Sequence, residues 1–244
     1  MNRKQFTMVE LLVVIGIIGV LAGLVFPAVS MARAAGRRTQ CVSNQGQLIK
    51  LLTITMQAYD NYLVTGGTYG TENSPDSTWT RYLYDKGKLQ DLKGYRCPSL
   101  PTNEKTALNS GSLTNAQLQS ALGVVEAKKG EGGKNYSGFD FRGNKRLKSG
   151  STMIAPAQLI LGGCSASVDS SSKIVPRANM FSSDKTKGYF YIVHEDQFNM
   201  YALDGHVESV TKEKAVDMRF IPDPEDGTGA VAITADSHIK NPED

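Results

Sequence analysis

The sequence has little charge imbalance and few of the residues from which catalytic and metal sites are usually built. Its 244 residues include 27 basic and 24 acidic side chains, a formal net charge of +3, and only three histidines and three cysteines. Such a balance gives no general nucleic-acid-binding pattern, so no nucleic acid partner is expected. With 40% hydrophobic residues, a disordered polyelectrolyte is also excluded. The length fits one ordinary domain with an appendage, or two small domains.

Short catalytic and metal-binding motifs are also missing. His194, Asp204 and His206 lie close together in the sequence, but they do not form a His-Glu-x-x-His pair. The segment Gly163-Cys164-Ser165-Ala166-Ser167 lacks the final glycine of a nucleophile elbow. We therefore expect no catalytic residue, no enzyme activity and no zinc site.

A stretch without any charged residue, 11–32, lies near the N-terminus. As a helix these 22 residues would be about 33 Å long, which matches a bilayer hydrocarbon core of about 30 Å. The apolar region of a secretory signal peptide is shorter, at about 7–15 residues, and a cleavage site follows it. The stretch therefore predicts a membrane-spanning helix. Apolar residues continue in three- and four-residue steps as far as Tyr59, which extends the predicted helix over 6–59.

Acidic residues are almost absent from this N-terminal part. Residues 1–59 contain six basic residues and a single acid, Glu10, at the edge of the apolar stretch. A carboxylate at such a place costs on the order of 2–3 kcal/mol unless it is paired. Glu10 therefore needs a partner.

The residues Phe6-Thr7-x-x-Glu10, after a short basic leader and before an apolar helix, resemble the N-terminal signal of type IV prepilins and type II secretion pseudopilins. Pro27 is similar to the proline that kinks pilin helices. The resemblance implies that a prepilin peptidase cuts between Gln5 and Phe6 and N-methylates the new amino terminus. Gln5 departs from the family, which has glycine before the cut.

The same resemblance implies a partner for Glu10 and a set of partners for the chain. Glu10 would pair with the amino terminus of Phe6 on a neighbouring subunit, which offsets the burial of both charges. The alternative is that it neutralises only its own helix terminus. The implied partners are the prepilin peptidase/N-methyltransferase, other pilin or pseudopilin subunits, an inner-membrane assembly platform and membrane lipid. The chain would cross the inner membrane once, with its head periplasmic or extracellular, and would reach the cell surface if assembled.

The rest of the chain predicts an antiparallel sheet. Apolar residues at helical spacing first predict a helix at 113–128. Alternating apolar residues then predict strands at 159–161, 188–194, 198–203, 206–210 and 230–233. Asp204-Gly205 predicts a two-residue hairpin turn in which Asn199 pairs with Val210. The expected fold class is pilin-like α+β, with a long N-terminal helix packed on an antiparallel β-sheet head.

His194, followed after nine residues by Asp204-Gly205, resembles the C-terminal signature of a prepilin-type subfamily. Arg96-Cys97-Pro98-Ser99 and Cys41 are similar to other recurrent elements of that subfamily. We interpret His194, Asp204 and Gly205 as structural. The strand between them would place His194 and Asp204 roughly 17 Å apart at about 3.3 Å per residue, too far for direct proton transfer.

Three cysteines in an extracytoplasmic domain favour one disulfide and one spare thiol. All three pairings are compatible with the sequence. The resemblance favours Cys41–Cys97, because both residues lie in matching segments, and it leaves Cys164 as a buried free thiol. Related pseudopilins bind calcium through loop carboxylates, so calcium is the one cofactor left open, although no EF-hand loop occurs.

The expected function is a non-catalytic subunit, a minor pilin or pseudopilin, of a type IV pilus-like or type II secretion fibre. Its parts would be a leader at 1–5, an assembly helix at 6–59 and a head at 60–244, larger than a bare structural pilin needs. An alternative of another class is a membrane-tethered cell-surface binding module that does not polymerise, which Gln5 favours. A membrane-tethered enzyme is a third reading.

Overall fold

The computed structural model describes most of the chain as helices, strands and short connections. The described residues are 7–58, 61–67, 78–85, 87–89, 92–100, 118, 121–125, 136–141, 147–168, 173–180, 188–217, 219–223 and 229–240. They fall into two compact units, 1–37 and 38–244. The N-terminal helix α1 (Met8–Ala58) begins in the first unit and ends in the second.

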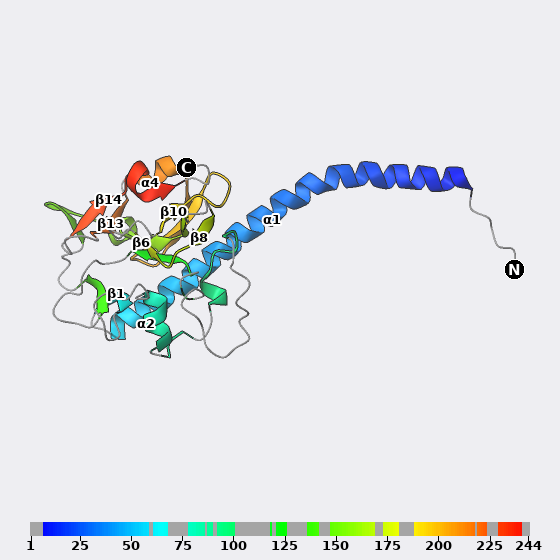
Figure 1. The fold of residues 1–244 in the computed structure, drawn as a ribbon. Helices are drawn as coiled ribbons and strands as arrows, with labels where there is room; N and C mark the ends of the chain where they lie inside the picture. Colours follow the sequence, from blue (N-terminus) through cyan, green and yellow to red (C-terminus); the bar gives the residue numbers. More distant parts are fainter. Residues whose placement is uncertain are drawn as a thin grey trace. The chain divides into compact units, whose positions relative to one another are not determined.

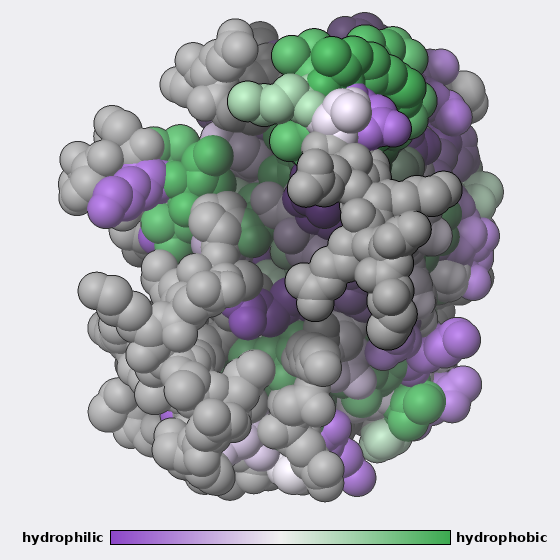
Figure 2. Space-filling model, turned by 90° about the vertical axis from the view of Figure 1, so that its right-hand side faces the viewer, coloured by the Kyte–Doolittle hydropathy of each residue, from purple (hydrophilic) through white to green (hydrophobic). Residues whose placement is uncertain are grey.

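In the first unit, α1 carries apolar side chains on all of its faces. Its large hydrophobic residues from Met8 to Met31 are exposed, including Leu24 and Phe26. Hydrophobic residues are coloured green in the space-filling view of Figure 2. Among the described residues, α1 is the one helix long and apolar enough to cross a membrane. The helix continues through Pro27, whose carbonyl oxygen accepts a hydrogen bond from Ser30 Oγ at 2.8 Å.

In the second unit, α1 packs on a β-rich body. Buried residues recur along it from Cys41 to Met56, and Leu48 and Leu52 are among the largest of them. These side chains join one continuous hydrophobic core with Trp79, whose indole Nε1 donates to the carbonyl oxygen of Ala178 at 2.9 Å. The α+β fold class expected from the sequence is confirmed.

Two larger sheets build this body (Figure 1). The first has the order β12-β11-β6-β2-β9, with strands β2 (Gly123–Val125), β6 (Ile160–Gly163), β9 (Asn179–Met180), β11 (Phe198–Ala202) and β12 (Val207–Val210). The second has the order β15-β10-β7-β8, with strands β7 (Ser165–Val168), β8 (Ile174–Pro176), β10 (Tyr189–Tyr191) and β15 (Ile239–Lys240). The pairs β2–β9 and β10–β15 are parallel, and the other pairs are antiparallel.

Smaller elements surround these sheets. Three two-stranded sheets pair β1 (Tyr62–Gly67) with β3 (Tyr136–Asp140), β4 (Lys148–Ser149) with β5 (Thr152–Met153), and β13 (Phe220–Pro222) with β14 (Ala230–Ala232). The described short helices are α2 (Trp79–Asp85), η1 (Lys93–Tyr95), η4 (Pro156–Gln158), α4 (Lys212–Val216) and α5 (Ala235–His238).

Two local predictions are wrong. The helix expected over 113–128 is wrong at Gly123–Val125, which form β2 and pair with β6 and β9; Leu118 is helical, and most of the other residues lie outside the described part. The hairpin register is also shifted by one residue, because Asn199 pairs with Ser209 instead of Val210. The turn has three residues, 203–205, closed by a hydrogen bond from Ala202 N to the carbonyl oxygen of His206 at 3.0 Å.

The backbone angles explain the longer turn. A two-residue Asp-Gly turn of type I′ requires a positive φ at both residues. Gly205 has a φ of +94°, whereas Asp204 is not among the described positive-φ residues. A three-residue loop needs a positive φ at only one position, which Gly205 supplies, so Asp204 does not need one.

Candidate metal centre

Three thiols and one imidazole meet inside the second unit. The Sγ atoms of Cys41, Cys97 and Cys164 and a ring nitrogen of His194 all lie within 4.8 Å of one another. The four residues are nearly inaccessible to solvent, with exposed fractions of 0%, 3%, 0% and 5% in that order. This cluster is named the Cys3His cluster below.

Each member of the Cys3His cluster comes from a different part of the fold. Cys41 lies on α1, Cys97 follows η1, Cys164 joins β6 to β7, and His194 follows β10. Tertiary folding alone brings them together, because they are separated by many residues in the sequence.

The separations within the cluster resemble the edges of a ligand tetrahedron. Cys164 Sγ lies 3.3 Å from Cys41 Sγ and 3.8 Å from Cys97 Sγ. His194 Nε2 lies 3.5 Å from Cys97 Sγ and 3.7 Å from Cys164 Sγ. Around tetrahedral zinc, with Zn–S near 2.3 Å and Zn–N near 2.0–2.1 Å, ligand atoms are separated by about 3.8 Å for S···S and about 3.6 Å for S···N. Three of the four separations are within about 0.2 Å of these values.

The imidazole of His194 is held with one nitrogen toward the sulfurs. Its Nδ1 lies 3.2 Å from Ser99 Oγ, and its backbone exchanges two hydrogen bonds with Gln197, at 2.9 Å and 3.1 Å. When Nδ1 carries the proton and donates to Ser99, Nε2 presents a lone pair to the cluster. Metal-binding histidines use this arrangement, in which a second residue fixes the ring through the other nitrogen.

The side-chain amide of Gln45 lies beside two of the sulfurs. Gln45, one helical turn after Cys41, places Nε2 3.4 Å from Cys164 Sγ and 3.7 Å from Cys41 Sγ. The same nitrogen donates to the carbonyl oxygen of Asn199 at 3.1 Å, and that oxygen also accepts from Cys164 N at 2.9 Å. An N–H donor beside sulfur favours a thiolate over a thiol, because it stabilises the negative charge.

Close backbone packing fixes the supporting segments. Asn44 Nδ2 donates to the carbonyl oxygen of Arg96 at 2.7 Å and so joins α1 to the segment that carries Cys97. On the other side, a Cβ atom at Gly163 would overlap the carbonyl oxygen of Asn199 and lie 2.9 Å from the ring of Phe190. Glycine at this position therefore allows β6 to bring Cys164 against its neighbours.

The thiols differ in acidity. Hydrogen bonds from Cys164 and Cys41, followed by contact with His194, hold the pKa of Cys97 far below its usual value of 9.0. Burial raises the pKa of Cys164 well above that value. Of the three thiols, Cys97 thus loses its proton most readily, since the pKa values of Cys41 and Cys164 are both raised. A bound dication would be needed to hold further thiolates there, since a metal deprotonates the thiols that coordinate it.

The expected disulfide is not formed in this arrangement. All three cysteines are free thiols, and Cys164, which was expected to be the spare one, lies beside Cys41. The Cys41–Cys97 pairing therefore stays a prediction.

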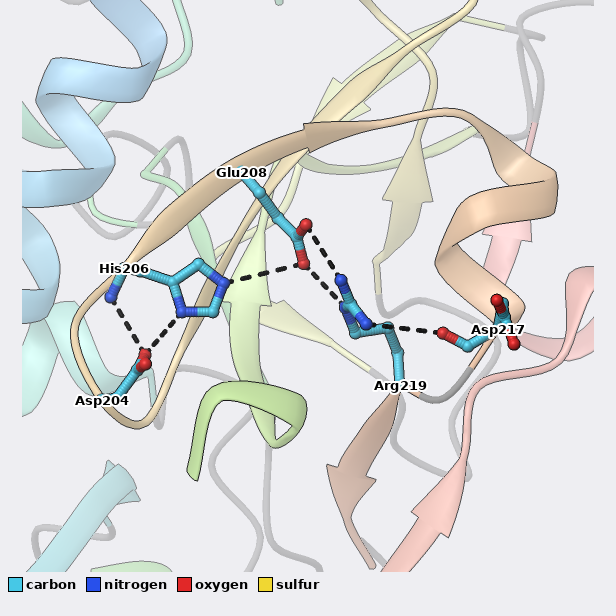
Figure 3. A network of polar contacts seen from close by, with 5 residues as sticks. All are labelled: Asp204, His206, Glu208, Asp217 and Arg219. Carbon is cyan, nitrogen blue, oxygen red and sulfur yellow. Dashed lines mark hydrogen bonds and ion pairs between the residues drawn. The ribbon is translucent and has the colours of Figure 1, made fainter. Parts of the chain in front are cut away.

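Asp204 and Gly205 lie in an exposed part of the fold. Asp204 Oδ1 accepts from His206 N at 3.1 Å and lies 2.6 Å from His206 Nδ1. His206 Nε2 lies 3.7 Å from Glu208 Oε1, and Glu208 forms a two-pronged ion pair with Arg219 at 2.7 Å and 3.0 Å (Figure 3). Partial burial raises the pKa of Asp204, but its hydrogen bonds with His206 outweigh this and lower it overall. His194 instead belongs to the buried cluster.

The processing and assembly residues are only partly described. Gln5 and Phe6 lie outside the described residues. Glu10 Oε2 accepts from Thr7 N at 2.8 Å and from Thr7 Oγ1 at 2.9 Å, while Thr7 Oγ1 accepts from Glu10 N at 3.2 Å. This reciprocal pair is a capping box, so Glu10 has a local partner at the start of α1.

Sequence reasoning did not anticipate the Cys3His cluster. The expectation of no zinc site depended on the absence of closely spaced ligands, whereas successive ligands of this cluster are 30 to 67 positions apart along the chain. One signal was present: Cys41, Cys97 and His194 all belong to the segments that carry the family resemblance. The expectation of no zinc site stays a prediction from the sequence.

Comparisons with known proteins add no relative. No family model matches the chain, and no curated protein or solved structure matches it either. The long apolar N-terminal helix packed on antiparallel β-sheets is consistent with a pilin-like architecture.

Proposed function

We propose that the protein is a non-catalytic subunit, a minor pilin or pseudopilin, of a type IV pilus-like or type II secretion fibre. The observation that carries this proposal is the division of α1. Its first part exposes large apolar residues on all faces, and its second part is built into a β-rich head. Such an apolar surface is stable only against lipid or against other apolar helices.

The composition of the first part suits helix–helix packing. Gly16, Gly19 and Gly23 have open space where a Cβ atom would stand, so a neighbouring helix can approach the backbone closely. In a fibre, the same contact would repeat between successive copies without closing into a ring. Lipid would cover this surface before assembly, and neighbouring subunits would cover it afterwards.

Processing would come before assembly. A prepilin peptidase/N-methyltransferase would cut before Phe6, and an inner-membrane platform would then draw the helix out of the bilayer. Cleavage leaves Thr7 and Glu10 in the mature chain, so their capping box would be retained. Glu10 would then be available to both its own helix terminus and the amino group of a neighbour.

Photo-crosslinking in the host tests this proposal. A photoreactive residue at Leu21, exposed on α1, should join copies of the chain, or this chain and other pilin-like subunits, into a ladder. The same residue at Val168, exposed on the head, is the matched control and should give a weaker ladder or none. Deleting the prepilin peptidase should abolish the ladder. A ladder that persists without the peptidase would contradict assembly by this route.

A second candidate is a membrane-tethered binding module that never polymerises, and Gln5 at the cleavage position favours it. In that case the residue at Leu21 would crosslink to lipid alone, and the chain would remain uncut in cells with an active peptidase.

A further inference from the structure

We propose that Cys41, Cys97, Cys164 and His194 form a structural binding site for one divalent zinc ion. The ion would be held by three Sγ atoms and by Nε2 of the histidine. This inference does not depend on assembly into a fibre, because all four ligands lie in the second unit of the chain.

The geometry is that of a site prepared for a small cation. Each S···S and S···N separation given above lies between 3.3 Å and 3.8 Å, near the edges of a zinc-centred tetrahedron. Four ligands converge on one point from four separate segments. The chemistry of the set, three soft thiolates and one imidazole, is typical of zinc and unlike the oxygen ligands that calcium or magnesium require.

The surroundings supply what such ligands need. Ser99 holds the other imidazole nitrogen, which leaves Nε2 directed at the sulfurs. Gln45 places an amide nitrogen near two of the three sulfurs, where it would partly offset the negative charge of a zinc–trithiolate. Ser99 and Gln45 are not ligands themselves. They orient and stabilise the side chains that are, as the residues around a metal site usually do.

The site is closed, which favours a structural role over a catalytic one. Its four positions are filled by protein atoms, and the ligands are buried, so no coordination position is left for water or substrate. Zinc here would fasten α1 to the segment after η1, to the β6–β7 connection and to the segment after β10. In this way it would do for the head what a disulfide does for many extracytoplasmic domains.

Oxidation is the competing fate of the same thiols. The sulfurs of Cys41 and Cys164 are 3.3 Å apart, so exchange with an external disulfide, which would be reduced to two thiols, could join them; that bond would remove two ligands and leave Cys97 free. Thiolates bound to zinc resist that reaction, since their electron pairs are engaged by the metal. Metal content and disulfide content should therefore exclude each other.

The test uses the chain purified in detergent from its host, whether or not residues 1–5 have been removed, without added metal or reductant. Elemental analysis should find one zinc per chain, and thiol titration after denaturation should find three thiols. Replacement of zinc by cobalt(II) should give the intense visible absorption of tetrahedral cobalt and the charge-transfer bands of cobalt–thiolate bonds. A chain that carries a disulfide and no zinc, or an octahedral cobalt spectrum, would overturn the proposal.

Variants separate metal binding from folding. His194→Ala should lose the zinc, whereas His194→Cys supplies a fourth thiolate and should keep it, with a cobalt spectrum shifted toward four sulfurs. Ser99→Ala should retain one zinc but weaken its binding about 10- to 100-fold, because the imidazole is no longer oriented. His206→Ala, at a partly exposed histidine outside the cluster, is the control and should retain zinc at full affinity. Zinc retained by His194→Ala with an unchanged cobalt spectrum would contradict the assignment.

Discussion

Cys41 Sγ lies 3.3 Å from Cys164 Sγ, although the two residues are 123 positions apart in the sequence. This contact joins the N-terminal helix to the centre of the β-rich body, and Cys97 and His194 complete the group. The stability of the head should therefore depend on what holds these four side chains together.

Removal of the metal should lower the melting temperature of the head. An ion that binds only the native state stabilises it by about 2.7 kcal/mol at 100 times its Kd. In a chain of this size, that corresponds to a fall of about 5–11 °C when a chelator is added. Differential scanning calorimetry with and without the chelator measures the effect. Cys164→Ser should have a lower melting temperature than the wild type, and the chelator should not change it. A fall in that variant equal to the fall in the wild type would contradict the zinc site.

Asn44 should matter because its side chain spans two elements. Asn44→Ala removes the 2.7 Å hydrogen bond to the carbonyl oxygen of Arg96, which should cost about 1–3 kcal/mol in the free energy of unfolding. Urea denaturation measures the loss. Lys50→Ala, at an exposed position of the same helix, is the control and should change stability by less than about 0.5 kcal/mol. Equal free energies of unfolding for the two variants would contradict a stabilising role of the hydrogen bond between Asn44 and Arg96.

The hairpin turn should tolerate a change at Asp204 better than one at Gly205. Asp204→Asn keeps an oxygen that can accept from His206 N, so folding should be preserved. Gly205→Val should destabilise the head by about 1–3 kcal/mol, because valine rarely adopts a φ of +94°. No atom lies within 4 Å of the added Cβ, so the cost would come from the backbone alone. Thermal melts of both variants decide this, and an unaffected Gly205→Val would contradict it.

Acid should weaken the network in Figure 3. Burial raises the pKa of Glu208, but the ion pair with Arg219 outweighs it and lowers this pKa below the ordinary value of 4.5. A carboxylate whose pKa is lowered by folding adds stability above its unfolded-state pKa, and that stability is lost as the pH falls through the folded-state pKa. Glu208→Gln should therefore destabilise the head at pH 7 and show a smaller further loss below about pH 4.5. The free energy of unfolding of both proteins is measured as a function of pH. If it falls equally in the variant and in the wild type below about pH 4.5, the contribution of the ion pair between Glu208 and Arg219 is refuted.

Glu10 should be needed for assembly and not for membrane insertion. Glu10→Val makes the segment more apolar, so the membrane-bound amount should be unchanged or higher, while the yield of sheared fibres should fall. Thr7→Val distinguishes the two partners proposed for Glu10, which are its own helix terminus and the amino group of a neighbour. The variant removes the hydroxyl of the capping box and leaves the carboxylate of Glu10 in place. If fibres need the carboxylate for a neighbour's amino group, Thr7→Val should assemble better than Glu10→Val. A normal yield of fibres from Glu10→Val would show that this carboxylate is not needed for assembly.

The sequence predicted the long helix well because its signal is strong and local. An uncharged apolar stretch followed by a regular apolar seam predicted a helix over 6–59, and α1 spans Met8–Ala58. Local patterns were weaker guides elsewhere. The apolar residues of 113–128 fit a helix, yet Gly123–Val125 forms a strand because β6 and β9 offer pairing on both sides. Pairing of this kind is a property of the whole fold, and it overrides local preference.

The Cys3His cluster could not be predicted from the sequence, for a related reason. Metal motifs that can be recognised in a sequence depend on ligands that one helix or one turn holds together. Here each ligand belongs to a separate element, and the register of β6, β10 and α1 decides whether they meet. The turn at 203–205 shows the same limit on a smaller scale, because Asp-Gly predicted a hairpin but not the number of residues in its turn.

The intact mass of the protein purified from its host tests the fibre-subunit account most directly. The account predicts a chain that has lost residues 1–5 and begins at Phe6 with a single added methyl group. The same spectrum recorded from a host without the prepilin peptidase should show the full-length, unmethylated chain. A mass that retains Met1 to Gln5 in cells whose peptidase is active on other substrates would contradict the proposed function.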